Sequence, residues 1–526
     1  MAKVKINGVV YDAGLGVLLG DLLTGQRSGE SPAFGRQGSD GNSGGSLMGL
    51  PHNSLMGLPC GGHGRCGKCR VRAHGALSPL SDAEKRLLSP EDIARGIRLA
   101  CCTAVEGDCS VELEQRGSGQ IRTAGDMPDI RLKPSFQAYG FVLDIGTTTL
   151  AARLYDAGGR VLAEGSGLNP QAVWGADVIS RIEADLRGEG HKLAQAIRGA
   201  VDGLVRELSG KAGIAPEDID GMAVTGNTVM LHLLTGTSTE PLSHAPFAAG
   251  RLFGETVTAK GLGLAALCPE TNVYLAPCAA AFVGADLITA VLAGALCDTP
   301  GTRLLADIGT NGEMALWHEG ALYCCSTAAG PAFEGAGISM GMGGSAGAVD
   351  RVAVKNGKLS AHVIGEGTAL GICGSGVVDA VACLLETGRM DDTGYLEEES
   401  AVVCEQVVFT QNDVRMVQLA KSAIHAGIRT LLHTAGLDCA RVEALLIAGG
   451  FGSYLDVGNA AKIGLFPEEL LPCIRVVGNA ALSGASMLLL NTDYRFVCES
   501  YAKGAKLVEL SSNSYFADEY MERMLF

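Results

Sequence analysis

Four cysteines have the spacing of ligands to a metal cluster. Cys60, Cys66 and Cys69 follow the pattern C-x5-C-x2-C, and a further thiol comes from the pair Cys101-Cys102. A cluster of two irons needs four thiolates, and a glycine-rich loop lets backbone N–H groups approach the sulfides. Such a loop is supplied by Gly61, Gly62, Gly64 and Gly67. The spacing therefore predicts a 2Fe–2S cluster.

A structural zinc site is the main alternative for these cysteines. Zinc motifs usually pair two CxxC knuckles, whereas this spacing is three plus one. It resembles that of vertebrate-type ferredoxins, in which the first gap is five residues. The ligand in this ferredoxin-like pattern directly follows Leu-Ala, so the resemblance favours Cys101 over Cys102 as the fourth ligand.

Two loops further along the chain could bind phosphate. The first is Asp144-Ile-Gly146-Thr147-Thr148, and the second is Asp307-Ile-Gly309-Thr310-Asn311. Each aspartate ends an apolar run. The glycine that follows has no Cβ, so the backbone can approach a phosphate, and the next residues donate through hydroxyl, amide or N–H groups.

The same loops predict a divalent cation and a catalytic role for Asp144 and Asp307. Two carboxylates that converge on a triphosphate repel it unless a cation lies between them, which implies Mg²⁺. One of the two could also orient or deprotonate the attacking water. A third glycine pair, Gly449-Gly450, follows another apolar run and offers a flat surface for adenosine. The alternative is that all three are tight turns in a domain that has lost nucleotide binding.

The elements that must position these residues fall into two regions. Residues 1–113 open with a hairpin signal around Asn7-Gly8, continue with a short leucine-rich run that could be one helix, and contain a Gly/Ser-rich insertion at 24–54. Residues 114–138 are polar and predict a linker. From 139 to 526, apolar strands alternate with helices, which is typical of the α/β class.

The second region contains an internal duplication. The run that begins at Phe141 resembles the run that begins at Leu304, and Met222–Asn227 resembles Leu446–Phe451. Two copies of one plan predict two facing lobes, at about 139–300 and 301–526.

Composition excludes several classes of function. With a net charge of −16 over 526 residues, nucleic acid is not an expected partner. The sequence shows no signal peptide and no uninterrupted apolar stretch of membrane-spanning length. The 17 cysteines are odd in number and scattered, which favours reduced thiols and a cytoplasmic protein. P-loop and Rossmann fingerprints are also absent from the sequence.

The three loop motifs resemble the phosphate-1, phosphate-2 and adenosine motifs of the ASKHA superfamily, which includes actin, Hsp70 and sugar kinases. Cys373–Asp379 and Gly478–Gly484 look like its interlobe segments. The resemblance implies an N-terminal ferredoxin-like β-grasp domain joined to a two-lobed ASKHA ATPase domain.

Further runs narrow the resemblance to the reductive activators of corrinoid proteins. They are Asn169–Gln171, Trp174–Ile182, Val283–Asp286, Ala328–Gly335 and Ala420–Gly427. The resemblance implies an anaerobic, ATP-dependent reduction of cob(II)amide to cob(I)amide in a corrinoid protein, through a 2Fe–2S cluster fed by an upstream low-potential donor. It also implies that the ATPase lobes bind the partner and form a homodimer.

Three other functions stay open at the level of sequence. The chain could drive electrons into another low-potential metalloenzyme, although such activators use a 4Fe–4S cluster between subunits. It could be a small-molecule kinase, which would not need the cysteine module. It could also be a non-catalytic sensor of ATP or redox state.

Overall fold

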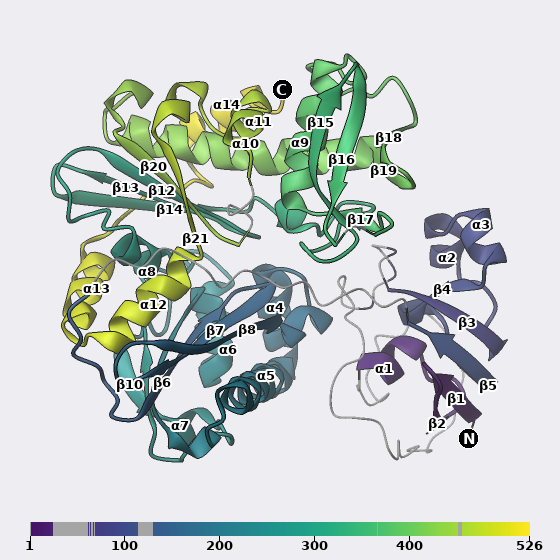
Figure 1. Cartoon of the computed structure of the whole chain (residues 1–526), viewed down its shortest axis with the longest axis horizontal. Helices are drawn as coiled ribbons and strands as arrows, with labels where there is room; N and C mark the ends of the chain where they lie inside the picture. Colours follow the sequence, from purple (N-terminus) through teal and green to yellow (C-terminus); the bar gives the residue numbers. More distant parts are fainter. Residues whose placement is uncertain are drawn as a thin grey trace. The chain divides into compact units, whose positions relative to one another are not determined.

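A computed structural model describes most of the chain (Figure 1), namely residues 2–24, 62, 64, 67, 69–113, 130–365, 367–450 and 455–526. The chain forms two compact units, Met1–Arg116 with Pro170–Ala184, and Gly117–Asn169 with Asp185–Phe526. No helix in the described residues is both long and apolar enough to cross a bilayer. The predicted insertion at 24–54 lies outside the described residues, except for Thr24.

The first unit is built on a five-stranded sheet in the order β2-β1-β5-β3-β4, in which only β1 and β5 pair in parallel. Its strands are β1 (Ala2–Ile6), β2 (Val9–Ala13), β3 (Arg70–Leu77), β4 (Ile97–Leu99) and β5 (Val105–Glu112). The predicted hairpin is confirmed, because Asn7 and Gly8 turn with φ of 48° and 93°. The leucine-rich run forms helix α1 (Leu19–Thr24) and leaves Leu15 exposed.

The core of this unit follows the two-residue period of its strands. Alternate residues such as Val4 and Ile6 on β1 point inward, and they pack with Leu19, Leu22 and Leu23 of α1. The short helices of the unit are α2 (Asp82–Leu87), α3 (Pro90–Ala94), η1 (Ala100–Cys102), η2 (Pro170–Val173) and α4 (Val178–Ala184).

The second unit contains two six-stranded sheets with one plan, as the internal duplication predicts. The first lobe has the order β10-β11-β9-β6-β7-β8, and the second has β21-β20-β12-β13-β14-β22. In each, an antiparallel meander (β6-β7-β8 or β12-β13-β14) is extended by two parallel strands. The strands are β6 (Tyr139–Ile145), β7 (Thr149–Asp156), β8 (Val161–Leu168), β9 (Ile219–Gly226), β10 (Glu255–Thr258), β11 (Asn272–Leu275), β12 (Arg303–Ile308), β13 (Gly312–His318), β14 (Ala321–Thr327), β20 (Ala444–Ala448), β21 (Ile474–Gly478) and β22 (Lys506–Leu507).

The second lobe also carries two small sheets. They are formed by β15 (Ala348–Lys355), β16 (Lys358–Val363) and β17 (Gly371–Ile372), and by β18 (Ser400–Cys404) and β19 (Val407–Thr410). The helices of the unit are α5 (Gly190–Ala212), α6 (Thr228–Thr235), α7 (Ala259–Leu262), α8 (Ala285–Ala293), α9 (Gly374–Glu386), α10 (Gln411–Thr434), α11 (Val457–Lys462), α12 (Ala480–Leu490), α13 (Asp493–Gly504) and α14 (Ser514–Glu522).

Two helices cross between the lobes. Helix α8 follows the first sheet, yet its Leu287 and Val291 pack with Leu305 and Leu446 of the second sheet. Helix α12 follows the second sheet, yet it packs on the first, beside β6 and β7 (Figure 1). This exchange buries apolar side chains of each lobe against the other, and it brings the loops at the strand ends of both sheets together.

Residues 130–138, at the end of the predicted linker, lie along the second unit. The N–H groups of Lys133 and Ser135 donate to the carbonyls of Leu490 and Leu489 at 2.8 and 3.0 Å. The chain therefore enters β6 along the end of α12.

Candidate functional site

The two predicted phosphate loops occupy equivalent places in the two lobes. The first connects β6 to β7 and the second connects β12 to β13. Asp144 pairs in register with Thr225 on β9, and Asp307 pairs with Ala448 on β20. The neighbouring parallel strand continues into a glycine with positive φ in both cases. These glycines are Gly226 (150°) and Gly449 (100°).

Local hydrogen bonds hold both loops. The Gly146 N–H donates to Thr149 O at 2.9 Å, and the buried amide of Asn169 donates to Gly146 O at 2.8 Å. In the second loop, the Gly330 N–H donates to Thr310 O at 3.0 Å. The run Asn169–Gln171 therefore begins with a residue that supports the first loop.

The structure brings the two loops into direct contact. Thr148 Oγ1 lies 3.0 Å from Thr310 Oγ1, although 162 positions separate them. Both hydroxyls also contact Glu334 Oε2, at 2.7 Å from Thr148 and 2.5 Å from Thr310. Donors from both lobes and one carboxylate thus meet at a single point.

Four further carboxyl groups, those of Asp144, Asp286, Asp307 and Glu313, interact with one another electrostatically and, through Asp307, with Glu334. Burial, reinforced by the charge of Asp286, raises the pKa of Asp144 to about 7, although the Asn479 amide opposes this shift by donating to Asp144 Oδ2 at 3.1 Å. Burial also raises the pKa of Asp307 to about 8, with contributions from Asp286, Asp144 and Glu334. Burial, and after it the neighbouring carboxyl groups, disfavour the ionised forms of both aspartates, so a bound cation would stabilise those forms.

Two of these carboxyl groups, Asp286 and Glu313, form a pair. Burial raises the pKa of both, and their side chains hydrogen-bond to each other. The Asn227 amide donates to Glu313 Oε1 at 3.1 Å. This pair connects α8 of the first lobe to β13 of the second.

The predicted adenosine pair lies beside the second phosphate loop. The Gly449 N–H donates to Gly478 O at 3.0 Å, and a Cβ at Gly449 would lie 2.5 Å from Ile308 O and 2.9 Å from Asp307 Oδ1. A side chain at this position would collide with the end of β12. Gly450 is exposed, and residues 451–454 lie outside the described residues.

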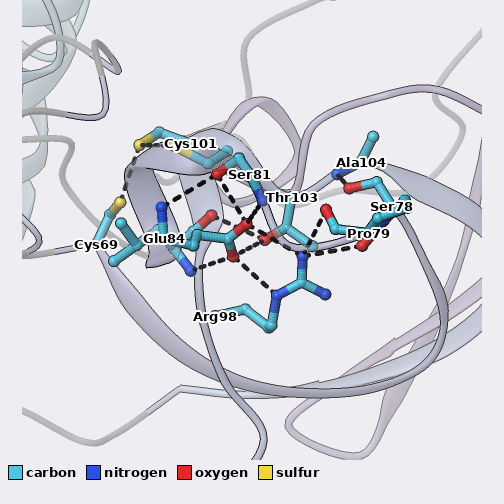
Figure 2. Close-up of polar contacts among 11 residues, drawn as sticks. Cys69, Ser78, Pro79, Ser81, Glu84, Arg98, Cys101, Thr103 and Ala104 are labelled. Carbon is cyan, nitrogen blue, oxygen red and sulfur yellow. Dashed lines mark hydrogen bonds and ion pairs between the residues drawn. The ribbon is translucent and has the colours of Figure 1, made fainter. Parts of the chain in front are cut away.

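In the first unit, two of the four predicted cluster ligands face each other. Cys69 Sγ lies 3.2 Å from Cys101 Sγ, and both side chains are buried (Figure 2). Two buried thiols at this distance suit ligands of one metal centre. Gly62, Gly64 and Gly67 all have positive φ, as a tight loop requires. Cys60 and Cys66 lie outside the described residues.

Cys102 is close to the same thiols. Its Sγ lies 3.5 Å from Cys101 Sγ, and it is half-buried. A Cβ at Gly64 would lie 3.0 Å from the Cys102 sulfur. The pair therefore presents two thiols to the loop, of which Cys101 is the one beside Cys69.

A carboxylate network holds the segment that carries Cys101. The fully buried Glu84 accepts from Arg98 Nε at 2.8 Å, from the Leu99 N–H at 3.1 Å and from Thr103 Oγ1 at 3.0 Å (Figure 2). It also closes the capping box of α2 with Ser81. The Ala100 N–H of the same segment donates to the backbone carbonyl of Cys69 at 2.8 Å, which ties this segment to the backbone of Cys69.

Asp286 and Glu334 lie in runs that carry the family resemblance, but the sequence alone predicts no role for either residue. Asn227, Glu313 and Glu84 were also missed. Glu84 had a local signal, because Ser81 and Glu84 form a capping-box pattern. The others depend on contacts between segments far apart in the sequence, which no local pattern reports.

Three family models match the chain. The C-terminal domain of RACo, described as the ASKHA domain, matches residues 301–526, and the RACo middle region matches residues 139–299. A 2Fe–2S iron–sulfur cluster binding domain matches residues 40–106. These matches and the observed sheets confirm the predicted fold class, a 2Fe–2S domain followed by a two-lobed ASKHA domain.

Individual relatives carry related descriptions. The corrinoid activation enzyme RamQ of Eubacterium limosum is 36% identical over 423 residues, covering 74% of this chain and 70% of the relative. A Co(II) methylated amine-specific corrinoid protein reductase of Methanosarcina barkeri is 26% identical over 392 residues, covering 67% and 70%. A solved structure of a reductive activator for a corrinoid, iron–sulfur protein is 26% identical with a TM-score of 0.71, covering 100% of this chain and 98% of that one.

Proposed function

Since the chain belongs to the family of reductive activators of corrinoid proteins, we propose that it reduces the cob(II)amide of a corrinoid protein to cob(I)amide and hydrolyses ATP to do so. The observation that carries the ATP part is the meeting of Thr148 and Thr310, donors from two lobes, at 3.0 Å. The facing thiols of Cys69 and Cys101 carry the redox part.

ATP is needed because the electron transfer is uphill. Cob(I)amide formation is unfavourable for ordinary ferredoxin potentials, and for a one-electron couple about 59 mV changes the equilibrium tenfold. A bound 2Fe–2S cluster would supply one electron at a time. The residues of the two lobes couple ATP hydrolysis to the electron transfer, because a triphosphate held by both loops fixes the lobes relative to each other.

The roles of individual residues follow from their positions. We assign Asp144 and Asp307 to a Mg²⁺ ion held through water, with one of them acting on the attacking water. Phosphate would be bound by Gly146, Thr147, Thr148, Gly309, Thr310 and Asn311, and adenosine by Gly449 and Gly450.

The cluster would be held by Cys60, Cys66, Cys69 and Cys101, and this ligand set gives a direct test. Cys101→Ser is expected to purify anaerobically without the visible absorbance of a 2Fe–2S cluster, whereas Cys102→Ser keeps it. Iron and sulfide analysis checks both. Loss of iron from Cys102→Ser alone would reverse the assignment.

The proposal also covers the location, oligomeric state, electron donor and domain division of the protein. It comprises a cytoplasmic homodimer, an upstream low-potential electron donor and a division of the chain into 1–113, a linker 114–138 and an ATPase domain 139–526. Size-exclusion chromatography with light scattering tests the dimer.

The central experiment mixes the reduced protein, Mg-ATP and candidate corrinoid proteins without oxygen and follows the cobalt absorbance. We expect cob(II)amide to convert to cob(I)amide only when ATP is present. Glu319→Gln, a change on the exposed turn between β13 and β14, serves as the control that keeps activity. If no candidate gives ATP-dependent cob(I)amide, the proposed function is wrong.

A further inference from the structure

Glu334 lies where the two predicted phosphate loops meet. It ends the short helix η6 (Pro331–Glu334), which lies between two left-handed glycines, Gly330 (φ 78°) and Gly335 (φ 76°). Ala332 and Phe333 of the same turn are buried in the core of the second lobe. The backbone is therefore fixed, and the side chain of Glu334 extends to the loops.

The contacts of Glu334 use the donors that a phosphate would need. A threonine hydroxyl has one proton to donate. The hydroxyls of Thr148 and Thr310 lie 2.7 and 2.5 Å from Glu334 Oε2, both closer than they lie to each other at 3.0 Å. Both protons are thus best used by the carboxylate, one from each lobe.

A triphosphate whose terminal phosphate accepted from both hydroxyls would not leave this arrangement unchanged. Its terminal phosphate is an anionic acceptor, as the carboxylate is, and two like charges that compete for the same two donors repel each other. A diphosphate lacks the group that would compete. The two nucleotides therefore differ in whether they must displace Glu334.

We propose that Glu334 is a specificity-determining residue that occupies the terminal-phosphate position until ATP displaces it, so that the protein distinguishes ATP from ADP by the position of this carboxylate. The inference rests on the ATP binding included in the proposed function. Displacement frees η6 from Thr148 of the first lobe while the phosphate takes over the link between the lobes. After hydrolysis and phosphate release, the carboxylate returns to both hydroxyls.

The test compares two nucleotides on the full-length, anaerobically purified protein. Isothermal titration calorimetry in the presence of Mg²⁺ measures the dissociation constants of ADP and of the non-hydrolysable β,γ-imido analogue of ATP. Glu334→Gln removes the charge, and we expect about tenfold tighter binding of the analogue, as the loss of a charge-assisted competitor implies. ADP affinity should change by less than about twofold, and Glu319→Gln, the same change on an exposed turn, should alter neither affinity.

A second variant and a crystal structure test the same inference independently. In Glu334→Asp the shorter side chain cannot reach both hydroxyls, so the analogue should again bind more tightly than to the wild type. A crystal structure of the wild-type protein with the analogue should show Glu334 away from Thr148 and Thr310. Unchanged or weaker analogue binding in both variants, or a carboxylate still on both hydroxyls, overturns the inference while the proposed function stands. If the wild type binds neither nucleotide, the ATP part of the proposed function fails as well.

Discussion

Carboxyl groups that are at least half-buried occur in both units of the molecule, and their pKa values are shifted in opposite directions. Glu84 in the first unit is fully buried, and burial alone would raise its pKa. Hydrogen bonds from Arg98, Ser81 and Leu99 outweigh this effect and lower the pKa to about 2. Asp144 and Asp307 in the second unit have pKa values raised to about 7 and about 8 by burial and by other carboxyl groups.

The direction of the pKa shift distinguishes a carboxylate that supports the fold from carboxyl groups that we assign to ligand binding. A carboxylate that only supports the fold is matched by cations and N–H donors within the chain. Carboxyl groups that await a ligand keep an unfavourable environment, which the ligand relieves. On this basis we assign Glu84 to the scaffold of Cys101, and the two aspartates to the proposed nucleotide site.

The largest expected effect comes from Asp307→Asn. Removing a carboxylate that acts on the cation and the attacking water should lower the ATPase rate by about 10²–10³-fold, or about 3–4 kcal/mol of transition-state stabilisation. The folded state should gain stability, on the order of 1 kcal/mol, because one member of a repelling group becomes neutral. Steady-state ATPase assays and urea unfolding measure both, with Glu319→Gln as the control. A rate within tenfold of the wild type would remove Asp307 from the nucleotide site.

Glu84→Gln should lower stability, whereas Asp307→Asn should raise it. It leaves the guanidinium of Arg98, whose side chain is 12% exposed, without its charged partner, and this should destabilise the first unit by about 3 kcal/mol. Hydrogen exchange of peptides from β3 and β5 reads this unit directly. The control is Asp82→Asn, on the same helix with a 99% exposed side chain, which should change stability by less than about 0.5 kcal/mol. Equal effects of the two substitutions would contradict the structural role of Glu84.

The two units should also respond to pH in opposite directions. The folded pKa of Glu84 is about 2, below its usual 4.5, so its stabilisation is present above pH 4.5 and is lost as the pH falls towards 2. Asp144 and Asp307 have folded pKa values above their usual 3.8. The second unit therefore loses stability as the pH rises from about 4 to about 8, and Mg²⁺ should oppose this loss.

Urea unfolding at several pH values checks this contrast. Trp317 on β13 reports on the second unit when Trp174, in the first unit, is replaced by Phe. Pulse labelling of β3 and β5 peptides reports on the first unit. If the unfolding midpoint of the second unit did not change between pH 4 and 8, the pKa values of Asp144 and Asp307 would not be raised as inferred above.

Local sequence patterns were sufficient for much of the fold. The Asn7-Gly8 turn, the strand ends at Asp144 and Asp307, and the duplicated plan of the two sheets all follow from short runs of residues. The crossing of α8 and α12 to the opposite sheets did not, because apolar helices do not specify which sheet they will cover. The role of Glu334 could not be predicted from the sequence either, since it depends on contacts with hydroxyls 186 and 24 positions away.

The smallest expected effect concerns Asn479, which has two functions in one side chain. Its oxygen caps α12 by accepting from the Leu482 N–H at 2.8 Å, and its amide donates to Asp144. Asn479→Ser keeps a good cap but removes the amide donor, so folding stability should change by less than about 0.5 kcal/mol. The pKa of Asp144 should rise, moving the pH dependence of Mg-ATP binding towards alkaline pH by about 0.7 of a unit, since a net hydrogen bond is worth about 1 kcal/mol.

Asn459→Ser is the matched control for this prediction. Asn459 donates to Asp379 at 2.7 Å, so the same substitution removes an amide donor from another aspartate of the second lobe. Asp379 is not among the groups that shift the pKa of Asp144. Calorimetric titration with Mg-ATP between pH 6 and 9 should show the displaced profile only for Asn479→Ser. If both variants, or neither, move the profile, then Asp144 does not govern the pH dependence, and the contrast between a matched and an unmatched carboxylate would have to rest on Asp307.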